Sequence, residues 1–400
     1  MMRSRRVASL ATLLFSAAQV SMIVLYPWIS EKSGLSLSQT ILFFSVGSLL
    51  FLFGSPFWGY IADQRGPKFA LQFGVLGQMV ALIGVGLVTY SADWMNSFGA
   101  GILLLVTRVI YGLTCSAIVP VSQAIHSNDL PGNRHRALSR HSMNLALGRV
   151  LGLTLVVLLK DHYASYLAAL VSCAALVLIL VTHQHSEVKF ENQFVPPKLT
   201  IKSLLRLNPP RSIRWFLTIV FVFSLVLESL NSLFSKTLQL RFDFTASQAS
   251  GRAALYLLMS ALVILLTQSI FRQLSKRENS HLVSVRGLKW GGGAFFAGVV
   301  LLGSADTGLR VVVALGLVSM GIGLVAPSYL TLISEREPSA RVAGLVSAIQ
   351  TLGYFAGGMM MALSIQGSVN LSWQLLSVIS VFWLFLIWIR LPKIDSEASC

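Results

Sequence analysis

The chain has 400 residues, of which 54% are hydrophobic and only 12% are charged. Soluble domains carry about 25% charged residues, so this composition excludes a soluble protein and predicts an integral membrane protein. The three cysteines, Cys115, Cys173 and Cys400, are too few and too scattered to predict a disulfide framework or a metal cluster.

Apolar stretches follow one another along the whole chain, each close to the roughly 20 residues that a helix needs to cross a bilayer. They lie near 8–29, 38–61, 68–90, 98–124, 138–159, 163–183, 214–235, 250–271, 283–303, 309–333, 341–365 and 371–390. The first stretch is too long for a signal-peptide core, and no small-residue cleavage site follows it. We therefore predict an all-α membrane protein with twelve transmembrane helices.

One connection is long enough to divide the chain near its middle. It runs from 184 to 213 and contains Pro196, Pro197, Pro209 and Pro210. We expect an N-terminal six-helix half at 1–183, a cytoplasmic linker at 184–213 and a C-terminal six-helix half at 214–400.

The net charge of +16 is distributed unevenly between the two sides of the predicted membrane. Most Lys and Arg residues lie in segments on the same side as both termini, whereas five lie on the other side: Lys32, Lys160, Lys236, Arg241 and Arg310. Because cytoplasmic loops carry the excess of Lys and Arg, both termini are predicted to be cytoplasmic. The basic balance is explained by topology, and nucleic acid is not an expected partner.

Two parts of the sequence recur at an offset near 207 residues. In the fourth and tenth spans, the spacing Gly112, Ser116, Pro120 recurs as Ser319, Gly323, Pro327. In the fifth and eleventh spans, Gly148 and Gly152 correspond to Gly353 and Gly357. Small residues at every fourth position allow helices to approach closely. The recurrence predicts that the two six-helix halves are pseudo-symmetric.

The loop between the second and third spans reads Gly59-Tyr-Ile-Ala-Asp63-Gln-Arg65-Gly66-Pro67-Lys68. It resembles the signature loop of the major facilitator superfamily, G-x-x-x-D-R-x-G-R-[RK]. The glycines, the aspartate and the final basic residue match, whereas Gln64 and Pro67 depart from the pattern. The resemblance implies a gating loop formed by Gly59, Asp63, Arg65, Gly66 and Lys68, in which the Asp63 carboxylate caps a helix of the opposite half and holds the cytoplasmic side closed.

Two further motifs resemble the proton-coupled exporters of that superfamily. Arg108-x-x-x-Gly112 in the fourth span is similar to their conserved arginine motif. Their Gly-Pro-x-x-Gly element is represented in the fifth span by Gly148-Arg149-Val-Leu-Gly152, with arginine in place of proline. This departure removes the expected proline kink and places an ionisable group inside the membrane.

Ionisable side chains at mid-membrane depth indicate function, and three are predicted there: Arg108, Arg149 and Glu228. The resemblance implies that they meet at the central cavity where such transporters bind substrate. Burial favours the protonated form of a carboxyl group, so Glu228 with Arg108 is predicted to couple protons to transport. The alternatives are a fixed ion pair between Glu228 and either arginine, and a purely structural role for Arg149.

Polar residues at spacings of three and four follow one face of several spans. They add further candidates for substrate contact: Gln19 in the first span, Asn231 in the seventh, and Gln350 and Tyr354 in the eleventh. Hydrogen bonding between helices is the alternative for these stripes. His126, His135 and His141 flank an inner loop without metal-ligand spacing, and we expect them to be solvated.

Two arginines and one acid give the predicted cavity a net positive charge, and guanidinium groups bind carboxylates and phosphates. We therefore predict proton-coupled export of a small amphiphilic or anionic molecule, such as a carboxylate-rich siderophore, across a bacterial inner membrane by alternating access. Import of an organic anion, efflux of cationic or lipophilic drugs, and a non-transporting sensor are the alternatives.

The expected partners are the substrate, protons and the lipid bilayer, and the chain is expected to act as a monomer. It contains no G-x-x-x-x-G-K-[ST] loop, which excludes ATP-driven transport by this chain alone. No cofactor, metal or enzymatic activity is expected.

Overall fold

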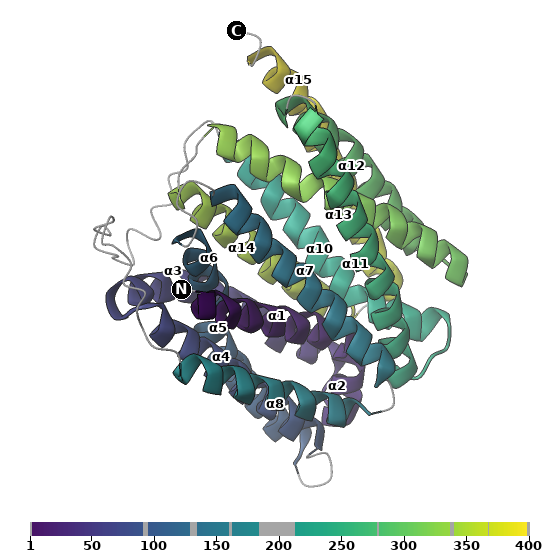
Figure 1. Cartoon of the computed structure of the whole chain (residues 1–400). Helices are drawn as coiled ribbons and strands as arrows, with labels where there is room; N and C mark the ends of the chain where they lie inside the picture. The colour runs from purple at the N-terminus through teal and green to yellow at the C-terminus, as the bar shows by residue number, and fades with distance from the viewer. Residues whose placement is uncertain are drawn as a thin grey trace. The chain divides into compact units, whose positions relative to one another are not determined.

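The computed structural model describes residues 2–90, 95–128, 134–159, 162–183, 213–277, 280–336, 340–366 and 368–397. Within these ranges every regular element is a helix (Figure 1). The helices are α1 (Met2–Val24), α2 (Tyr26–Ser33), α3 (Leu37–Arg65), α4 (Pro67–Tyr90), α5 (Ser97–Cys115), α6 (Ile118–Asn128), α7 (Arg134–Leu158), α8 (Tyr163–Thr182), α10 (Arg214–Arg241), α11 (Ala246–Arg277), α12 (Ser280–Gly303), α13 (Gly308–Arg336), α14 (Ala340–Ser364) and α15 (Val369–Glu397).

Among the described residues, 11 helical stretches are long and apolar enough to cross a membrane, judged by length and composition. The fifth predicted span corresponds to α7, whose apolar part is the shorter stretch Met143–Leu158. The predicted all-α membrane fold is thereby confirmed. The predicted linker 184–213 lies almost wholly outside the described residues.

The described residues form two compact units. The first contains α1 to α8 together with residues 245–254 at the start of α11, and the second contains residues 213–244 and the chain from 255 onward. Each unit has its own core of packed helices.

In the first unit, α7 packs closely against α1 through two glycines. A Cβ atom on Gly148 would lie 2.3 Å from the Leu13 carbonyl oxygen, and one on Gly152 would lie 2.6 Å from that of Ala17. Any larger residue at these positions would force the two helices apart.

The second unit repeats this packing with α14 against α10. A Cβ atom on Gly353 would lie 2.6 Å from the Phe221 carbonyl oxygen, and one on Gly357 would lie 2.3 Å from that of Leu225. The glycines that correspond in sequence thus make equivalent contacts in the two units, as the pseudo-symmetric halves require.

Two predicted single spans are each divided into two helices in the structure. The stretch 8–29 divides at Leu25, two residues before Pro27, and the stretch 98–124 divides after Cys115, five residues before Pro120. Proline has no backbone N–H to donate and its ring clashes with the preceding turn. The span prediction did not include these interruptions, and the stretch 97–126 is still long and apolar enough to cross a membrane as one span.

Side chains of α3 compensate for the break between α5 and α6. Pro120 cannot donate to the Ser116 carbonyl, and the Ser55 hydroxyl donates to that oxygen instead at 3.3 Å. The Leu113 carbonyl accepts from the Trp58 indole N–H at 2.5 Å and from the Ser116 hydroxyl at 3.0 Å. Because buried carbonyls need partners, these contacts stabilise the divided span.

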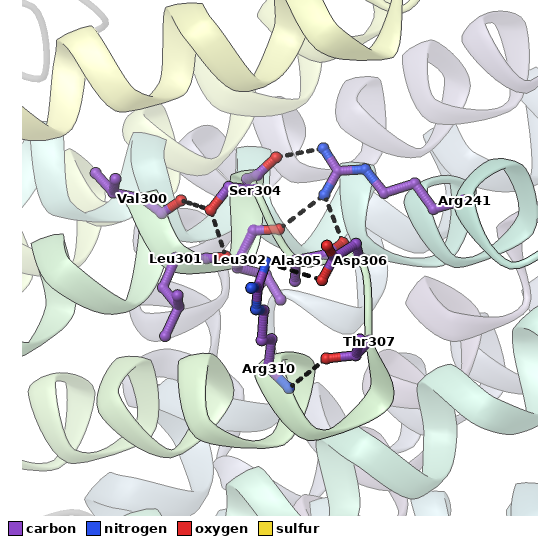
Figure 2. Close-up of polar contacts among 10 residues, drawn as sticks. Arg241, Val300, Leu301, Leu302, Ser304, Ala305, Asp306, Thr307 and Arg310 are labelled. Carbon is purple, nitrogen blue, oxygen red and sulfur yellow. Dashed lines mark hydrogen bonds and ion pairs between the residues drawn. The ribbon is translucent and has the colours of Figure 1, made fainter.

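The Arg241 guanidinium at the end of α10 forms hydrogen bonds with the end of α12 (Figure 2). Arg241 donates to the carbonyls of Leu302 and Ala305, both at 3.1 Å, and also to that of Gly303. The last turn of a helix leaves carbonyl oxygens without intrahelical partners, and the guanidinium lies against this end of α12, where the Leu302 carbonyl also accepts from the Ala305 backbone N–H at 3.3 Å. The sequence prediction had counted Arg241 only as an outer positive charge.

Candidate functional site

Arg108 of α5 is almost completely buried in the first unit, with 4% of its surface exposed. Its guanidinium carbon lies 3.8 Å from the centre of the Phe44 ring and 5.0 Å from that of Tyr111. Its Nε atom has no hydrogen-bond partner, and no ion pair reaches the group from the described residues. Aromatic faces thus stabilise the cation while its in-plane N–H groups remain available to an acceptor.

An aromatic cluster extends from Arg108 across three helices. The Tyr111 ring lies 5.5 Å from that of Phe51 on α3 and 6.3 Å from that of Phe15 on α1. Phe44 also contacts Tyr26 of α2 at 4.7 Å. Phe15, Tyr26 and Tyr111 were not among the predicted site residues, although the position of Tyr111 one turn after Arg108 is a signal that could have identified it.

Arg149 lies on an exposed face of α7, on the turn that carries Gly148 and packs against α1. Its exposure is compatible with contact to substrate, lipid or water, so the predicted choice between binding and structural roles stays open.

The polar stripe of α1 is used mainly for packing within the first unit. Ser16 donates to the Leu145 carbonyl of α7 at 2.7 Å, and Ser9 accepts a hydrogen bond from the Asn144 amide at 2.9 Å. These contacts agree with the alternative of interhelical hydrogen bonding. Gln19, in contrast, is exposed and stays a candidate for substrate contact.

Two of the histidines near the inner loop that were expected to be solvated are buried in the structure. His126 is 4% exposed and His141 is 1% exposed, and their ring centres are 6.1 Å apart. The expectation of solvated side chains was wrong for this pair because α6 and α7 pack them against α1. The side chain of His135 lies outside those described. No group of three His, Cys, Asp or Glu side chains that could hold a metal occurs within the described ranges.

Glu228 is half-buried on α10 in the second unit. The side chains of Asn231 and Ser232 are the polar groups that interact with its carboxylate. No ion pair to Glu228 is found within the described part of its own unit. The polar groups around the carboxylate are thus hydroxyl and amide groups.

The candidates on α14 differ from one another. The Gln350 amide donates to the Tyr329 hydroxyl of α13 at 2.6 Å, so this part of its polar group is engaged in packing between helices. Tyr354 is half-buried one turn further along. Their proposed contact with substrate stays a prediction.

The predicted gating loop is a sharp turn between α3 and α4. Gly66 ends α3 with φ of 89°, a conformation that favours glycine, and Pro67 begins α4 immediately afterwards. Arg65 lies over the Phe69 ring at 5.3 Å. Gly59 and Lys68 are half-buried on the flanking helices, and the side chain of Asp63 lies outside those described.

The family assignment follows from comparison with known proteins. The sequence model of the Major Facilitator Superfamily matches residues 7–362. The chain belongs to the Major Facilitator Superfamily. The predicted resemblance is confirmed, and the protein is a multi-pass membrane transporter by family.

Curated relatives of this chain are named for multidrug resistance. The chain is 30% identical over 199 residues to a protein named multidrug resistance protein MdtG from Serratia proteamaculans, covering 47% of this chain and 46% of the relative. A namesake from Escherichia fergusonii is 30% identical over 157 residues, covering 38% and 35%. The matched region therefore spans less than half the length of these relatives.

Solved structures of this superfamily share the fold at low sequence identity. A D-xylose–proton symporter superposes with a TM-score of 0.73 at 14% identity, covering 97% of both chains. The human organic anion transporter MFSD10 gives 0.67 at 18% identity, covering 96% of this chain and 99% of its own. At these identities the likeness concerns the fold alone.

Proposed function

We propose that this facilitator-superfamily protein is a secondary transporter that exports a small amphiphilic anion in exchange for protons by alternating access. The observation that carries the proposal is the guanidinium of Arg108, which is buried in a membrane span without an acceptor among the described residues. An uncompensated charge at this depth is costly. A carboxylate or phosphate on the substrate would supply the missing partner through paired N–H···O bonds.

The surroundings of Arg108 support an amphiphilic substrate. Phe44 and Tyr111 contact the guanidinium, and Phe51 extends the same apolar surface along α3. A ligand that carries a flat or branched apolar body beside its anionic group fits this combination. A carboxylate-rich metabolite of the siderophore type belongs to this class.

Glu228 is the proposed proton carrier. Hydroxyl and amide neighbours and the lack of an ion pair within the described part of its unit allow its carboxylate to accept a proton and release it later in the cycle. Arg108 and Glu228 would then respond to opposite charges, one to the substrate anion and the other to the proton. The loop around Gly66 would govern the closure of the inner side.

The remaining parts of the proposal rest on charge distribution and relatives. The excess of Lys and Arg on one side supports cytoplasmic termini, and the bacterial relatives support an inner-membrane location. We propose a monomer in the lipid bilayer as the working unit. Import of an organic anion on the same fold is the alternative direction.

A second candidate function is efflux of lipophilic or cationic drugs. It is favoured by the names of the curated relatives, which describe multidrug resistance. The aromatic cluster around Phe51 and Tyr111 would suit such compounds. A buried cation without an acceptor argues against them, because it repels a second positive charge.

The deciding experiment uses the purified protein in liposomes with an imposed pH gradient and a fluorescent reporter of lumenal pH. Carboxylate metabolites, iron-free siderophores and cationic dyes are added one at a time. Proton movement triggered by anions supports the proposal, and movement triggered only by cations supports the drug-efflux alternative. No movement with any compound, in either gradient direction, would contradict proton coupling.

A further inference from the structure

One face of α10 carries a line of hydroxyl groups on both sides of Glu228. Ser224, Ser232 and Ser235 are 1%, 2% and 2% exposed, and their oxygen atoms have no hydrogen-bond partner. Ser232 lies beside the Glu228 carboxylate and interacts with it, but its hydroxyl does not reach ordinary hydrogen-bond geometry with any partner. Buried hydroxyls without partners are uncommon, and each calls for an explanation.

Other hydroxyls of the same helix are fully engaged. Ser229 donates to the Leu225 carbonyl at 2.8 Å and lies 3.3 Å from that of Gly357. Thr237 donates to the Leu233 carbonyl at 2.9 Å and accepts from the Trp373 indole N–H at 2.9 Å. Among the described residues of α10, the hydroxyls without a partner are therefore confined to the face that carries Glu228.

The spacing of these groups suits single bridging waters. Positions three or four apart on a helix place their Cβ atoms about 5–6 Å apart, and the hydroxyls of Ser224, Ser232 and Ser235 form no direct hydrogen bond across these intervals. One water molecule between two such oxygens spans this gap with two ordinary hydrogen bonds. Ser224, Glu228, Ser232 and Ser235 follow one another at these intervals.

Within the described part of the second unit, the helices packed against α10 carry no charged residue at this depth. In α13, α14 and α15, charged residues occur only towards the helix ends. Their titratable groups deeper in the membrane are the phenols Tyr329 and Tyr354, and the Tyr329 hydroxyl already accepts from Gln350. A proton that reaches this face therefore has Glu228 as its acceptor.

We propose that Ser235 and Ser232 form the outer half, and Ser224 the inner half, of a water-mediated proton path to Glu228. This inference rests on the proposed function. In the predicted topology the C-terminal end of α10 faces outward, so Ser235 is the first hydroxyl from the outside. In the described conformation the three hydroxyls are buried. Protons therefore move along the path only when water enters this face of α10. The dry state prevents an uncoupled flow of protons across the membrane.

The proton transfer along this path is balanced. A hydronium ion at the outer end gives its proton to the first bridging water. Each hydroxyl accepts one proton and passes its own to the next water, so the O–H bonds are exchanged without net change. The last water protonates the Glu228 carboxylate, which becomes a neutral carboxylic acid.

The test follows protonation of Glu228 directly and needs no substrate. Purified protein in lipid nanodiscs is subjected to a rapid drop in pH, and time-resolved infrared spectroscopy records the carboxylic acid band that is absent in Glu228→Gln. Ser235→Ala should slow the appearance of this band about tenfold. Ser229→Ala, with an engaged hydroxyl on the same helix, and Ser235→Thr, which keeps a hydroxyl, should match the wild-type rate.

The outcomes distinguish the proposed proton path from the proposed transport function. Slowing in Ser235→Ala and Ser232→Ala but not in the two controls supports the path, and the second variant gives the same information if the first does not fold. Equal rates in Ser235→Ala and Ser229→Ala would overturn the path while leaving the proposed transport function intact. A wild-type protein without any Glu228 band would overturn both the path and the coupling role of Glu228.

Discussion

The Ser16 hydroxyl of α1 donates to the Leu145 carbonyl of α7 at 2.7 Å. Leu145 lies four residues before Arg149, so its carbonyl is also the acceptor for the Arg149 backbone N–H in a regular helix. The exporter pattern has proline at this position, and proline would remove that N–H. If proline stood at position 149, the Leu145 carbonyl would lose the backbone N–H donor but would keep the hydrogen bond from the Ser16 hydroxyl.

We predict that Arg149→Pro loses less stability than a proline at a neighbouring position of α7. Proline inside a helix costs about 3 kcal/mol or more, but here the acceptor keeps a hydrogen bond from Ser16. Val150→Pro, one residue further along, has no such donor for its acceptor, Ala146, and should lower the melting temperature markedly. Thermal unfolding of both variants in detergent measures the difference, and equal losses would contradict the role of Ser16.

The same Arg149→Pro variant tests whether Arg149 reads the charge of the substrate. If it does, preference in the liposome assay should shift from anions towards neutral or cationic compounds. An unchanged preference would assign Arg149 a structural role.

Arg108 is predicted to determine selectivity for anions. Arg108→Gln removes the buried charge and should reduce anion-driven proton movement at least about tenfold, which corresponds to ~1.4 kcal/mol of lost interaction. Arg108→Lys keeps the charge but loses the paired N–H geometry and should retain an intermediate activity. Full anion transport by Arg108→Gln in the liposome assay would remove Arg108 from the binding site.

The fold was largely predictable because membrane spans are defined by the length and apolarity of local segments. The glycine repeats were equally informative, since Gly148 and Gly353 make equivalent close contacts in the two units. The helix breaks near Pro27 and Pro120 were missed because the surrounding sequence stays apolar. Whether a proline kinks or divides a span depends on hydrogen-bond donors for the carbonyls near the break. The donor Trp58, which bonds the Leu113 carbonyl, comes from another helix.

The candidate site was predictable only in its charges. Arg108 and Glu228 stand out in an apolar sequence, whereas the contact of Arg108 with Phe44 of α3 depends on tertiary packing. The burial of His141 shows the same limit, because the position of a helix end relative to its neighbours is not encoded locally. The spacing of polar residues identified Gln350, but its hydrogen bond to Tyr329 could not be predicted from the sequence.

The Trp58–Leu113 contact is predicted to stabilise the divided fourth span. Trp58→Phe keeps an aromatic ring but removes the N–H donor, which should lower stability by about 0.5–1.5 kcal/mol. The Leu113 carbonyl retains its bond from Ser116, so a larger loss is not expected. Trp388→Phe changes an exposed ring of α15 and serves as the control in thermal unfolding. Equal stability of the two variants would show that the indole N–H is dispensable.

Glu228→Gln should abolish transport driven by a pH gradient while leaving the folded yield unchanged. The amide is close in size to the protonated carboxyl and keeps polar contact with Asn231 and Ser232, but it cannot release a proton. Exchange of labelled substrate across liposomes without a gradient should persist, because it requires no net proton transfer. Undiminished gradient-driven flux in the variant would remove Glu228 from the coupling mechanism.

Arg241 is predicted to contribute to stability rather than to selectivity. Its guanidinium satisfies carbonyls at the end of α12 (Figure 2), and hydrogen bonds to charged groups contribute about 1.5–3 kcal/mol each when buried. Since Arg241 is half-buried, Arg241→Leu should lower the free energy of unfolding by about 1–2 kcal/mol in total. Arg310→Gln breaks only the exposed pair with Asp306 at 2.9 Å and should cost less than about 1 kcal/mol. Denaturation of the two variants in detergent gives the comparison, and a greater loss in Arg310→Gln would show that the exposed pair, not the Arg241 contacts, holds this end of the second unit together.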